Sequence, residues 1–330
     1  MAILVVALAA TLAIYLLWQQ SIALRQIQNL DARAQVREIA RAGTTWAAAI
    51  ISQDDRTTDN LGEPWAQPLP PIEVEQATLE GNIVDEQSKF NLNSVYQPGA
   101  GAAAAADPGQ SGTQSGMGAQ SGMAGSGSSA AAGGGTGAQA NLPADAFRKL
   151  LSRLNIDPSL CDALIDWIDP DSIVTEPGGA EDTYYLSQEP PYRAGNNYLA
   201  SIGELRLIKG FTPEIVDRLS PYVTALPSTA TKININTATP DMLTNFMYDV
   251  NAETIVASRN RAPFTKVDDF HKLVNDQAWT RLNPLIDIKS DFFSANARVT
   301  QGRTSITYHA ILQRSATGWP QILSISEEPM

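Results

Sequence analysis

The amino-terminal segment is the feature that most constrains what this chain can fold into. The first 24 residues, MAILVVALAATLAIYLLWQQSIAL, contain no charged side chain before Arg25. A helix of about 20 apolar residues is long enough to cross the hydrocarbon core of a bilayer. Tyr15 and Trp18 stand near the end of the run, where aromatic rings favour the membrane–water interface. We therefore predict that residues 1–24 are the transmembrane part of a helix.

The helix is expected to continue beyond the membrane. From Met1 to Ala42 the sequence has no glycine and no proline, so nothing interrupts the helix where the apolar run ends. The part after Arg25 mixes apolar residues with arginines, which predicts an apolar stripe that covers another part of the protein. A continuous helix of about 60 Å follows from a rise of about 1.5 Å per residue. A cleaved signal peptide is the alternative, but the run is long, has no basic leader and is followed by no obvious cleavage site.

Composition limits the classes of function. A chain of 330 residues with 43% hydrophobic content is expected to form two or three domains. The net charge of −12 argues against a general affinity for nucleic acid or anionic lipid. Cys161 is the only cysteine, which excludes an internal disulfide and a thiolate metal cluster. With only His271 and His309, a histidine-rich zinc site is also disfavoured.

The rest of the chain divides into segments that differ in composition and in the spacing of their apolar residues. Residues 25–97 continue the helix and then contain a proline-rich turn region and a short strand in GNIVDEQSKFNLNSV. Residues 98–140 are a Gly/Ala/Ser-rich tract that predicts a flexible insertion. Residues 141–288 carry helical patterns, and residues 289–330 alternate as antiparallel strands do. In the last range, Ile306, Tyr308, Ala310 and Leu312 are predicted to share the buried face.

Two segments resemble helix-hairpin-helix units, which makes a membrane-anchored DNA receptor an alternative function. They are LIKGFTPEIVDRLSPYV from Leu207 and the stretch from Lys232 to Phe270. DNA-binding hairpins of this type use glycine so that backbone amides can approach a phosphate, but no glycine occurs between Phe211 and Gln301. Residues 141–290 also hold 14 Lys and Arg against 20 Asp and Glu, the wrong sign for phosphate binding. The hairpins are better interpreted as packing units.

An acidic stretch is the candidate site. DWIDPDSIVTEPGGAED, Asp166 to Asp182, holds six carboxylates, and no basic residue occurs from Leu154 through Tyr192. Prolines and the Gly178–Gly179 pair are expected to bend the chain so that the acids approach one another. A bound calcium ion, which prefers several oxygen ligands, and an open solvated loop both account for the pattern. A hydrolase with paired carboxylates is a third interpretation, but nothing nearby supplies a substrate platform.

Several stretches together resemble one known family, the type II secretion minor pseudopilin called general secretion pathway protein K. They include the apolar start, DEQSKFNLN, LIDWIDPD, GGAEDTYYLSQEPPYRAGN, ELRLIKG, NINTATPDML and SDFFSANARV, and they extend from end to end of the chain. The resemblance implies an α+β fold, in which a pilin-like long helix packs on a small antiparallel sheet and a large all-helical domain is inserted. Residues 25–97 and 289–330 would then be the two parts of the pilin body.

The resemblance also implies a site and a role for the amino-terminal helix. The inserted domain of structurally known relatives carries calcium, which transfers to the matching acids here as a structural cofactor. The candidate ligands are Asp169, Asp171, Glu176, Glu181 and Asp182. Most pseudopilins have glutamate at the fifth position, whereas this chain has Val5, as the K type does; Val5, Tyr15 and Trp18 are thus the marked positions of the membrane and assembly helix.

The function implied by the resemblance is structural. K-type proteins are not enzymes; they help to initiate the pseudopilus and occupy its tip, and so support export of folded proteins across the outer membrane. The expected partners are the I- and J-type minor pseudopilins, through the helices and heads, with the inner membrane and secreted substrates as further contacts and no nucleic acid. The expected location is the bacterial inner membrane, crossed once, with the bulk of the chain in the periplasm.

Overall fold

The computed structural model of the chain describes residues 2–97, 141–302, 304–315 and 318–329. The predicted insertion at 98–140 lies outside the described residues. Contacts within the chain define two compact units. The first contains residues 1–90, 221–224 and 231–330, and the second contains residues 91–220 and 225–230.

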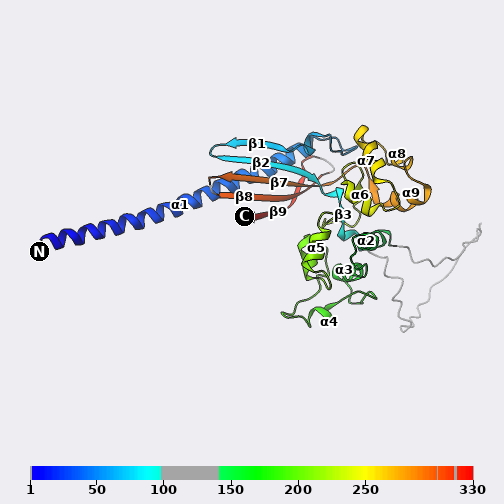
Figure 1. The fold of residues 1–330 in the computed structure, drawn as a ribbon, viewed down its shortest axis with the longest axis horizontal. Coiled ribbons are helices and arrows are strands. Elements are labelled where there is room, and N and C mark those ends of the chain that lie inside the picture. Colours follow the sequence, from blue (N-terminus) through cyan, green and yellow to red (C-terminus); the bar gives the residue numbers. More distant parts are fainter. Residues whose placement is uncertain (1, 98–140, 303, 316–317, 330) are drawn as a thin grey trace, which may run out of the picture. The chain divides into compact units, whose positions relative to one another are not determined.

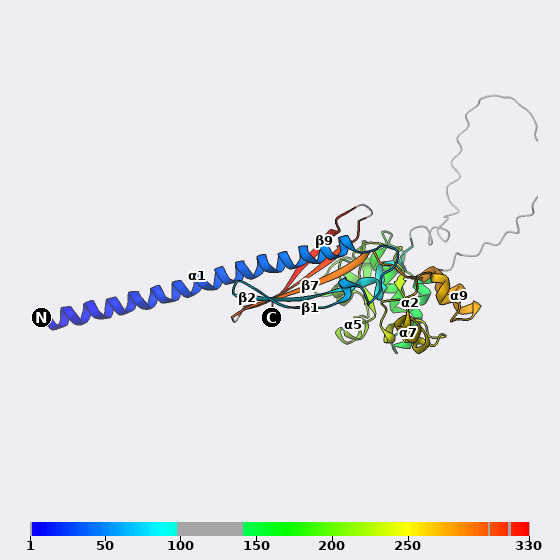
Figure 2. The ribbon, with the colours of Figure 1, turned by 90° about the horizontal axis from the view of Figure 1, so that it is seen from above.

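Helix α1 (Ala2–Gln53) belongs to the first unit and extends well beyond the sheet on which it packs (Figures 1 and 2). Its side chains are exposed from residue 2 to residue 31 wherever they are described, and by length and composition this helix could span a membrane. Burial begins at Val36 and recurs at Ala40, Ala47 and Ile51, which share one face of the helix. The predicted continuous helix with a packed second half is confirmed.

Gly43 does not end this helix, which continues to Gln53. A Cβ atom at position 43 would lie 3.1 Å from Cβ of Ala297 and 3.3 Å from a methyl carbon of Leu79. The glycine therefore allows α1 to approach the sheet closely, and a larger residue would force the two layers apart.

Five antiparallel strands form the sheet under α1, in the order β1-β2-β7-β8-β9. They are β1 (Leu69–Val74), β2 (Ala77–Asp85), β7 (Phe292–Gln301), β8 (Thr304–Gln313) and β9 (Gln321–Pro329). The predicted inward face of β8 is confirmed, because Ile306, Tyr308, Ala310 and Leu312 are all buried. The sequence did not reveal β1, because Pro70 and Pro71 suggest a turn; prolines are tolerated here because β1 is an edge strand.

The first unit also contains short helices and strands from a segment that the prediction placed elsewhere. They are η1 (Pro64–Ala66), η2 (Glu86–Ser88), β4 (Val223–Thr224), β5 (Ile233–Asn234), α6 (Pro240–Phe246), α7 (Ala252–Arg261), α8 (Val267–His271), α9 (Asp276–Leu282), η5 (Asn283–Leu285) and β6 (Ile286–Asp287). Residues 141–288 were predicted to form one inserted domain, whereas residues 231–288 group here with the long helix and the sheet.

Asp85, at the end of β2, gives a physical reason for this grouping. Its Oδ2 accepts hydrogen bonds from Asn234 (3.1 Å), Thr237 (2.5 Å) and Ser290 (2.6 Å). The side chain is buried and burial raises its pKa to about 7, so the network joins β5 to the sheet inside a water-poor interior.

The second unit is helical. After β3 (Phe90–Asn91), which spans the boundary, it contains η3 (Leu92–Val95), α2 (Leu142–Arg153), α3 (Leu160–Ile168), α4 (Asp182–Tyr185), η4 (Ile202–Leu207) and α5 (Pro213–Leu219). Phe147, Leu150 and Leu164 form part of its buried core. Cys161 is fully buried as well, and burial raises the pKa of its thiol to about 12, which leaves it a packing side chain.

Candidate functional site

The acidic loop of the second unit is built around the buried carboxylate of Asp166 in α3. Both carboxylate oxygens of Asp166 lie 3.1 Å from the backbone nitrogen of Thr175, which donates to them. Gly179 packs so closely against Asp166 and the carbonyl of Thr175 that any Cβ atom at position 179 would collide with them. Asp166 thus folds the loop back on itself, and the Gly-Gly pair makes room for that return.

Three carboxylates converge in this folded loop. One oxygen from each of Asp169, Asp171 and Glu181 lies within 4.8 Å of the others. Asp169 is 7% exposed and Glu181 is 4% exposed, whereas Asp171 lies at the surface and accepts a hydrogen bond from the backbone of Ile173 at 2.8 Å. Asp169 Oδ1 and both Oε atoms of Glu181 are buried, and none of the residues that the structure describes donates a hydrogen bond to them.

The electrostatic cost of this group is visible in its pKa values. Burial, followed by the neighbouring charges of Asp171 and Asp166, raises the pKa of Asp169 to about 6. Burial, followed by the charges of Asp166, Asp169 and Asp171, raises the pKa of Glu181 to about 7. Both causes disfavour the ionised carboxylates, and no Lys or Arg within the described ranges forms an ion pair with the three acids.

The other two predicted ligands lie outside the group. Glu176 is exposed on the loop and is not part of the converging set. Asp182, at the start of α4, accepts a hydrogen bond from the backbone of Ala194 at 2.9 Å and lies 3.6 Å from the guanidinium of Arg193. The structure therefore brings together three of the five candidates.

Basic residues from outside the acidic segment compensate part of its charge, which the sequence did not show. Arg148 of α2 contacts Asp162 at 2.7 Å, and Arg193 contacts Asp182. Lys209 donates to the carbonyl of Gly179 at 2.9 Å. The basic partners of Asp162 and Asp182 thus lie outside Leu154–Tyr192, the stretch without a basic residue. Among the described residues, no basic side chain forms an ion pair of this kind with the Asp169–Asp171–Glu181 group.

Aromatic side chains pack against one another at the base of the acidic loop. The ring centres of Trp167 and Tyr185 are 5.1 Å apart and nearly perpendicular, and Tyr192 lies 5.4 Å from Tyr185. Tyr192 also donates from its hydroxyl to the carbonyl of Leu207 at 2.8 Å. These contacts fix the α3 end that carries Asp169 and the α4 start that carries Glu181.

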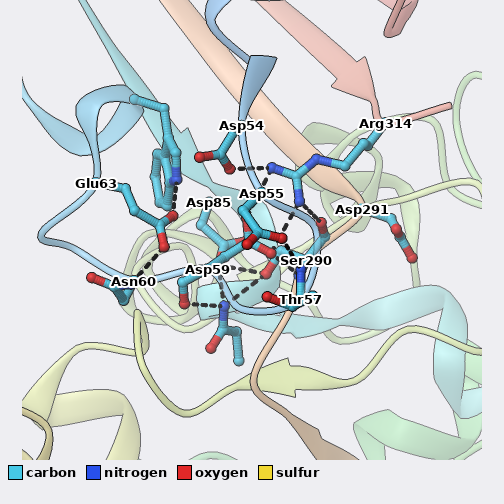
Figure 3. Close-up of polar contacts among 12 residues, drawn as sticks. Asp54, Asp55, Thr57, Asp59, Asn60, Glu63, Asp85, Ser290, Asp291 and Arg314 are labelled. Carbon is cyan, nitrogen blue, oxygen red and sulfur yellow. Dashed lines mark hydrogen bonds and ion pairs between the residues drawn. The ribbon is translucent and has the colours of Figure 1, made fainter. Parts of the chain in front are cut away.

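A second group of three carboxylates lies in the first unit and was not predicted. Asp54, Asp59 and Glu63 also place one oxygen each within 4.8 Å of one another. Here Arg314, at the end of β8, reaches between them, 2.7 Å from Asp54 and 2.8 Å from Asp59 (Figure 3). Because the protein supplies this cation itself, the group is an internal ion-pair network.

The marked residues of the amino-terminal helix lie in its exposed half. Tyr15 and Trp18 are 57% and 60% exposed, with ring centres 6.4 Å apart, and Val5 lies in the same helix. This placement suits an interface belt at the end of a membrane span.

Comparison with known proteins connects these features to one family. Residues 88–228, which include the whole acidic loop, match the family described as type II secretion system protein K. The type II secretion system protein K of Aeromonas hydrophila is 29% identical over 311 residues, covering 88% of this chain and 84% of that protein. That of Pseudomonas aeruginosa is 28% identical over 341 residues, covering 98% of this chain and 89% of that protein.

Over most of its length this chain is similar to type II secretion system protein K, and its residues 88–228 match the model of that family. The fold agrees with that of the crystal structure of the GspK–GspI–GspJ complex from enterotoxigenic Escherichia coli. The TM-score is 0.73 at 21% identity, with 92% of this chain and 100% of that chain covered. The predicted recognition and fold class are thus confirmed: a pilin-like long helix on a small antiparallel sheet, with a helical inserted region.

Proposed function

We propose that this chain is a minor pseudopilin at the tip of the type II secretion pseudopilus, where it helps to initiate assembly and supports export of folded proteins. The observation that carries the proposal is the division of α1. Its part from Val36 to Ile51 packs on the sheet, whereas the apolar residues from 2 to 31 have no cover within the described part of the chain. The apolar half of such a helix is covered by the membrane before assembly and by the helices of neighbouring subunits after assembly.

The tip position is supported by size. The second unit adds a helical body to the helix and sheet of a pilin. Subunits packed side by side through their long helices leave little space between successive heads, so a head enlarged in this way is hard to repeat along a filament. We propose that the chain stands at one end, with I- and J-type minor pseudopilins as partners, in analogy to the GspK–GspI–GspJ complex.

The proposed location is the inner membrane, crossed once by α1, with the bulk of the chain in the periplasm. The proposed role is structural and not catalytic. The helix hairpins support a packing role over the alternative of a DNA receptor: Met242, Leu243 and Ile255 are buried. Arg259 donates to the carbonyls of Ile235 and Ala238 at 2.8 and 2.6 Å, so its guanidinium is bonded to the protein's own backbone.

We propose in addition that Asp169, Asp171 and Glu181 hold a structural calcium ion. Their donor set fits, because all the ligand atoms are carboxylate oxygens and three buried oxygens of the group accept no hydrogen bond from the described part of the chain. A bound cation would supply the positive charge that this loop lacks and so hold α3 to the start of α4. Glu176 and Asp182 are not in the proposed set.

The proposed function is tested in a type II secreting bacterium whose own K gene is deleted. The full chain should restore release of secreted proteins into the medium, and it should co-purify from detergent extracts with the I- and J-type pseudopilins. A variant with Leu12→Asp and Leu16→Asp, which disrupts the exposed apolar half of α1, should lose both properties. Normal secretion without the chain would overturn the proposal.

A further inference from the structure

The two edges of the five-stranded sheet are built differently. At one edge, β1 contains Pro70 and Pro71, which lack backbone N–H groups and so discourage a further strand from pairing. The register is irregular at both edges, between Leu69 and Ile72 in β1 and between Ile311 and Leu312 where β8 pairs with β9, so the prolines are what distinguishes the two edges. At the other edge, β9 is nine residues long and contains no proline before Pro329. Within the described residues, β9 pairs only with β8, so one side of its backbone is open.

One face of the open edge carries two exposed isoleucines, followed by Glu327, which stands opposite Tyr308 and pairs with Arg37 of α1. Ile322 stands opposite Leu312 and Ile325 stands opposite Ala310, and these two partners are buried under α1. The two isoleucines are 37% and 45% exposed, because α1 packs mainly over β7 and β8. The other face of β9 carries Ser324 and Ser326. The strand therefore has the two-sided pattern of an inner strand, although it lies at an edge.

We propose that β9 accepts an extended strand from another pseudopilin head, so that the sheet continues across the contact between the two subunits. This inference rests on the proposed function. The backbone of β9 would provide hydrogen bonds along the strand from Ser324 onward, beyond the irregularity next to Ile322, and the exposed isoleucines would select apolar side chains on the face towards α1. Exposed polar residues on the opposite face would match Ser324 and Ser326.

The occupant is a different chain and not a second copy. A symmetric pair of β9 edges is antiparallel, so its two-fold axis lies perpendicular to the strands and reverses them. Helix α1 lies lengthwise along the strands in both views (Figures 1 and 2), and it would be reversed as well. Two such helices would leave in opposite directions and could not enter one membrane from the same side. A partner with its own sheet and a helix anchored in the same membrane has no such conflict.

A matched pair of variants tests the proposal in the full chain. Ile325→Lys places a charge on the face of the open edge that carries the isoleucines. Ile72→Lys makes the same change in β1, the edge strand that contains the two prolines. Ile72 is 43% exposed and stands opposite Leu79, which packs against the core under α1. Each variant is co-expressed with the I- and J-type pseudopilins and purified in detergent. Ile325→Lys should weaken co-purification about tenfold or more, and Ile72→Lys should leave it within about twofold of the unchanged chain.

Amide hydrogen exchange separates strand pairing from a contact of side chains alone. In the complex, backbone amides of β9 should exchange about tenfold more slowly than in the isolated chain, while amides of β1 should not change. Equal co-purification of the two variants, or unprotected β9 amides in the complex, would overturn the inference and leave the proposed function standing. Failure of the unchanged chain to bind either pseudopilin would instead count against the proposed function.

Discussion

The two groups of three carboxylates are alike in spacing and differ in whether a basic side chain of the protein contacts them. Asp54 and Asp59 contact the guanidinium of Arg314, which also lies 4.8 Å from the ring centre of Phe293. Glu63, by contrast, accepts hydrogen bonds from Asn60 and Trp65. The group in the acidic loop has no such partner among the described residues, and three of its buried oxygens lack a donor.

Comparing the two groups shows which structural property indicates that a buried acidic group needs a bound cation. The number of acids does not distinguish the two sites, and nor does burial, since Asp59 is fully buried in the first group and Glu181 is nearly so in the second. What distinguishes them is whether the protein supplies the cation. The first group should therefore be insensitive to calcium and sensitive to the loss of one arginine, and the second should behave in the opposite way.

The largest effect is expected from Arg314→Met. The change leaves Asp54 and Asp59 buried without their cation, so the free energy of unfolding should fall by about 3–5 kcal/mol, with or without calcium. Denaturant unfolding followed by tryptophan fluorescence measures it. Arg41→Met is the control, because Arg41 pairs with Glu38 on the exposed side of α1 and should contribute about 0.5 kcal/mol or less. If the two changes lowered the free energy of unfolding equally, the ion pairs of Arg314 would contribute no more to stability than an exposed pair, and the proposed contrast between the two acidic groups would be wrong.

The second effect is the response to calcium itself. At a calcium concentration of about 100 times the dissociation constant, the full chain should gain about 2.7 kcal/mol of stability over the same chain in chelator. The double change Asp169→Asn with Glu181→Gln should abolish this gain and should raise stability in chelator, because it removes like charges. Glu189→Gln, an exposed acid nearby, is the control. Identical melting of the unchanged chain in calcium and in chelator would refute the metal site.

A third prediction concerns pH. The pKa values of Asp169 and Glu181, about 6 and about 7, are raised above those of the unfolded chain, so the folded state binds more protons. In chelator, their contribution is fully present at low pH and is lost as the pH rises through 6 to 7. Bound calcium replaces the protons and removes this loss. The stabilisation by calcium should therefore be larger at pH 7.5 than at pH 5.5, as measured by thermal unfolding at both values, and a constant difference would contradict it.

The sequence revealed the parts of this molecule that depend on local pattern. The long helix follows from an apolar run without glycine or proline, and the inner face of β8 follows from alternation. The end of α1 could not be predicted, because Gly43 serves a close approach to the sheet and not a helix stop. Strand β1 was hidden by prolines that only an edge position tolerates.

What the sequence could not reveal is long-range pairing of charge. Arg314 is more than 250 residues from Asp54, and nothing in either local pattern connects them. Arg148 and Asp162 belong to different helices, so the basic partner of that acid lies outside Leu154–Tyr192, the stretch that has no basic residue. The candidate ligands were recognised as a stretch, but only the fold separates the three that converge from the two that do not.

The smallest effect is expected from changing the two candidate ligands that lie outside the converging group. Asp182→Asn keeps an oxygen that can accept from the Ala194 backbone and loses only the ion pair with Arg193, whose side chain is 77% exposed. Stability should change by about 1 kcal/mol or less, and calcium affinity by less than about twofold in calorimetric titration of the full chain. Glu176→Gln should do less still, since Glu176 lies exposed on the loop. A tenfold loss of affinity in Asp182→Asn would mean that calcium draws α4 further into the loop. The ligand set would then be defined by the bound ion and not by the folded chain alone.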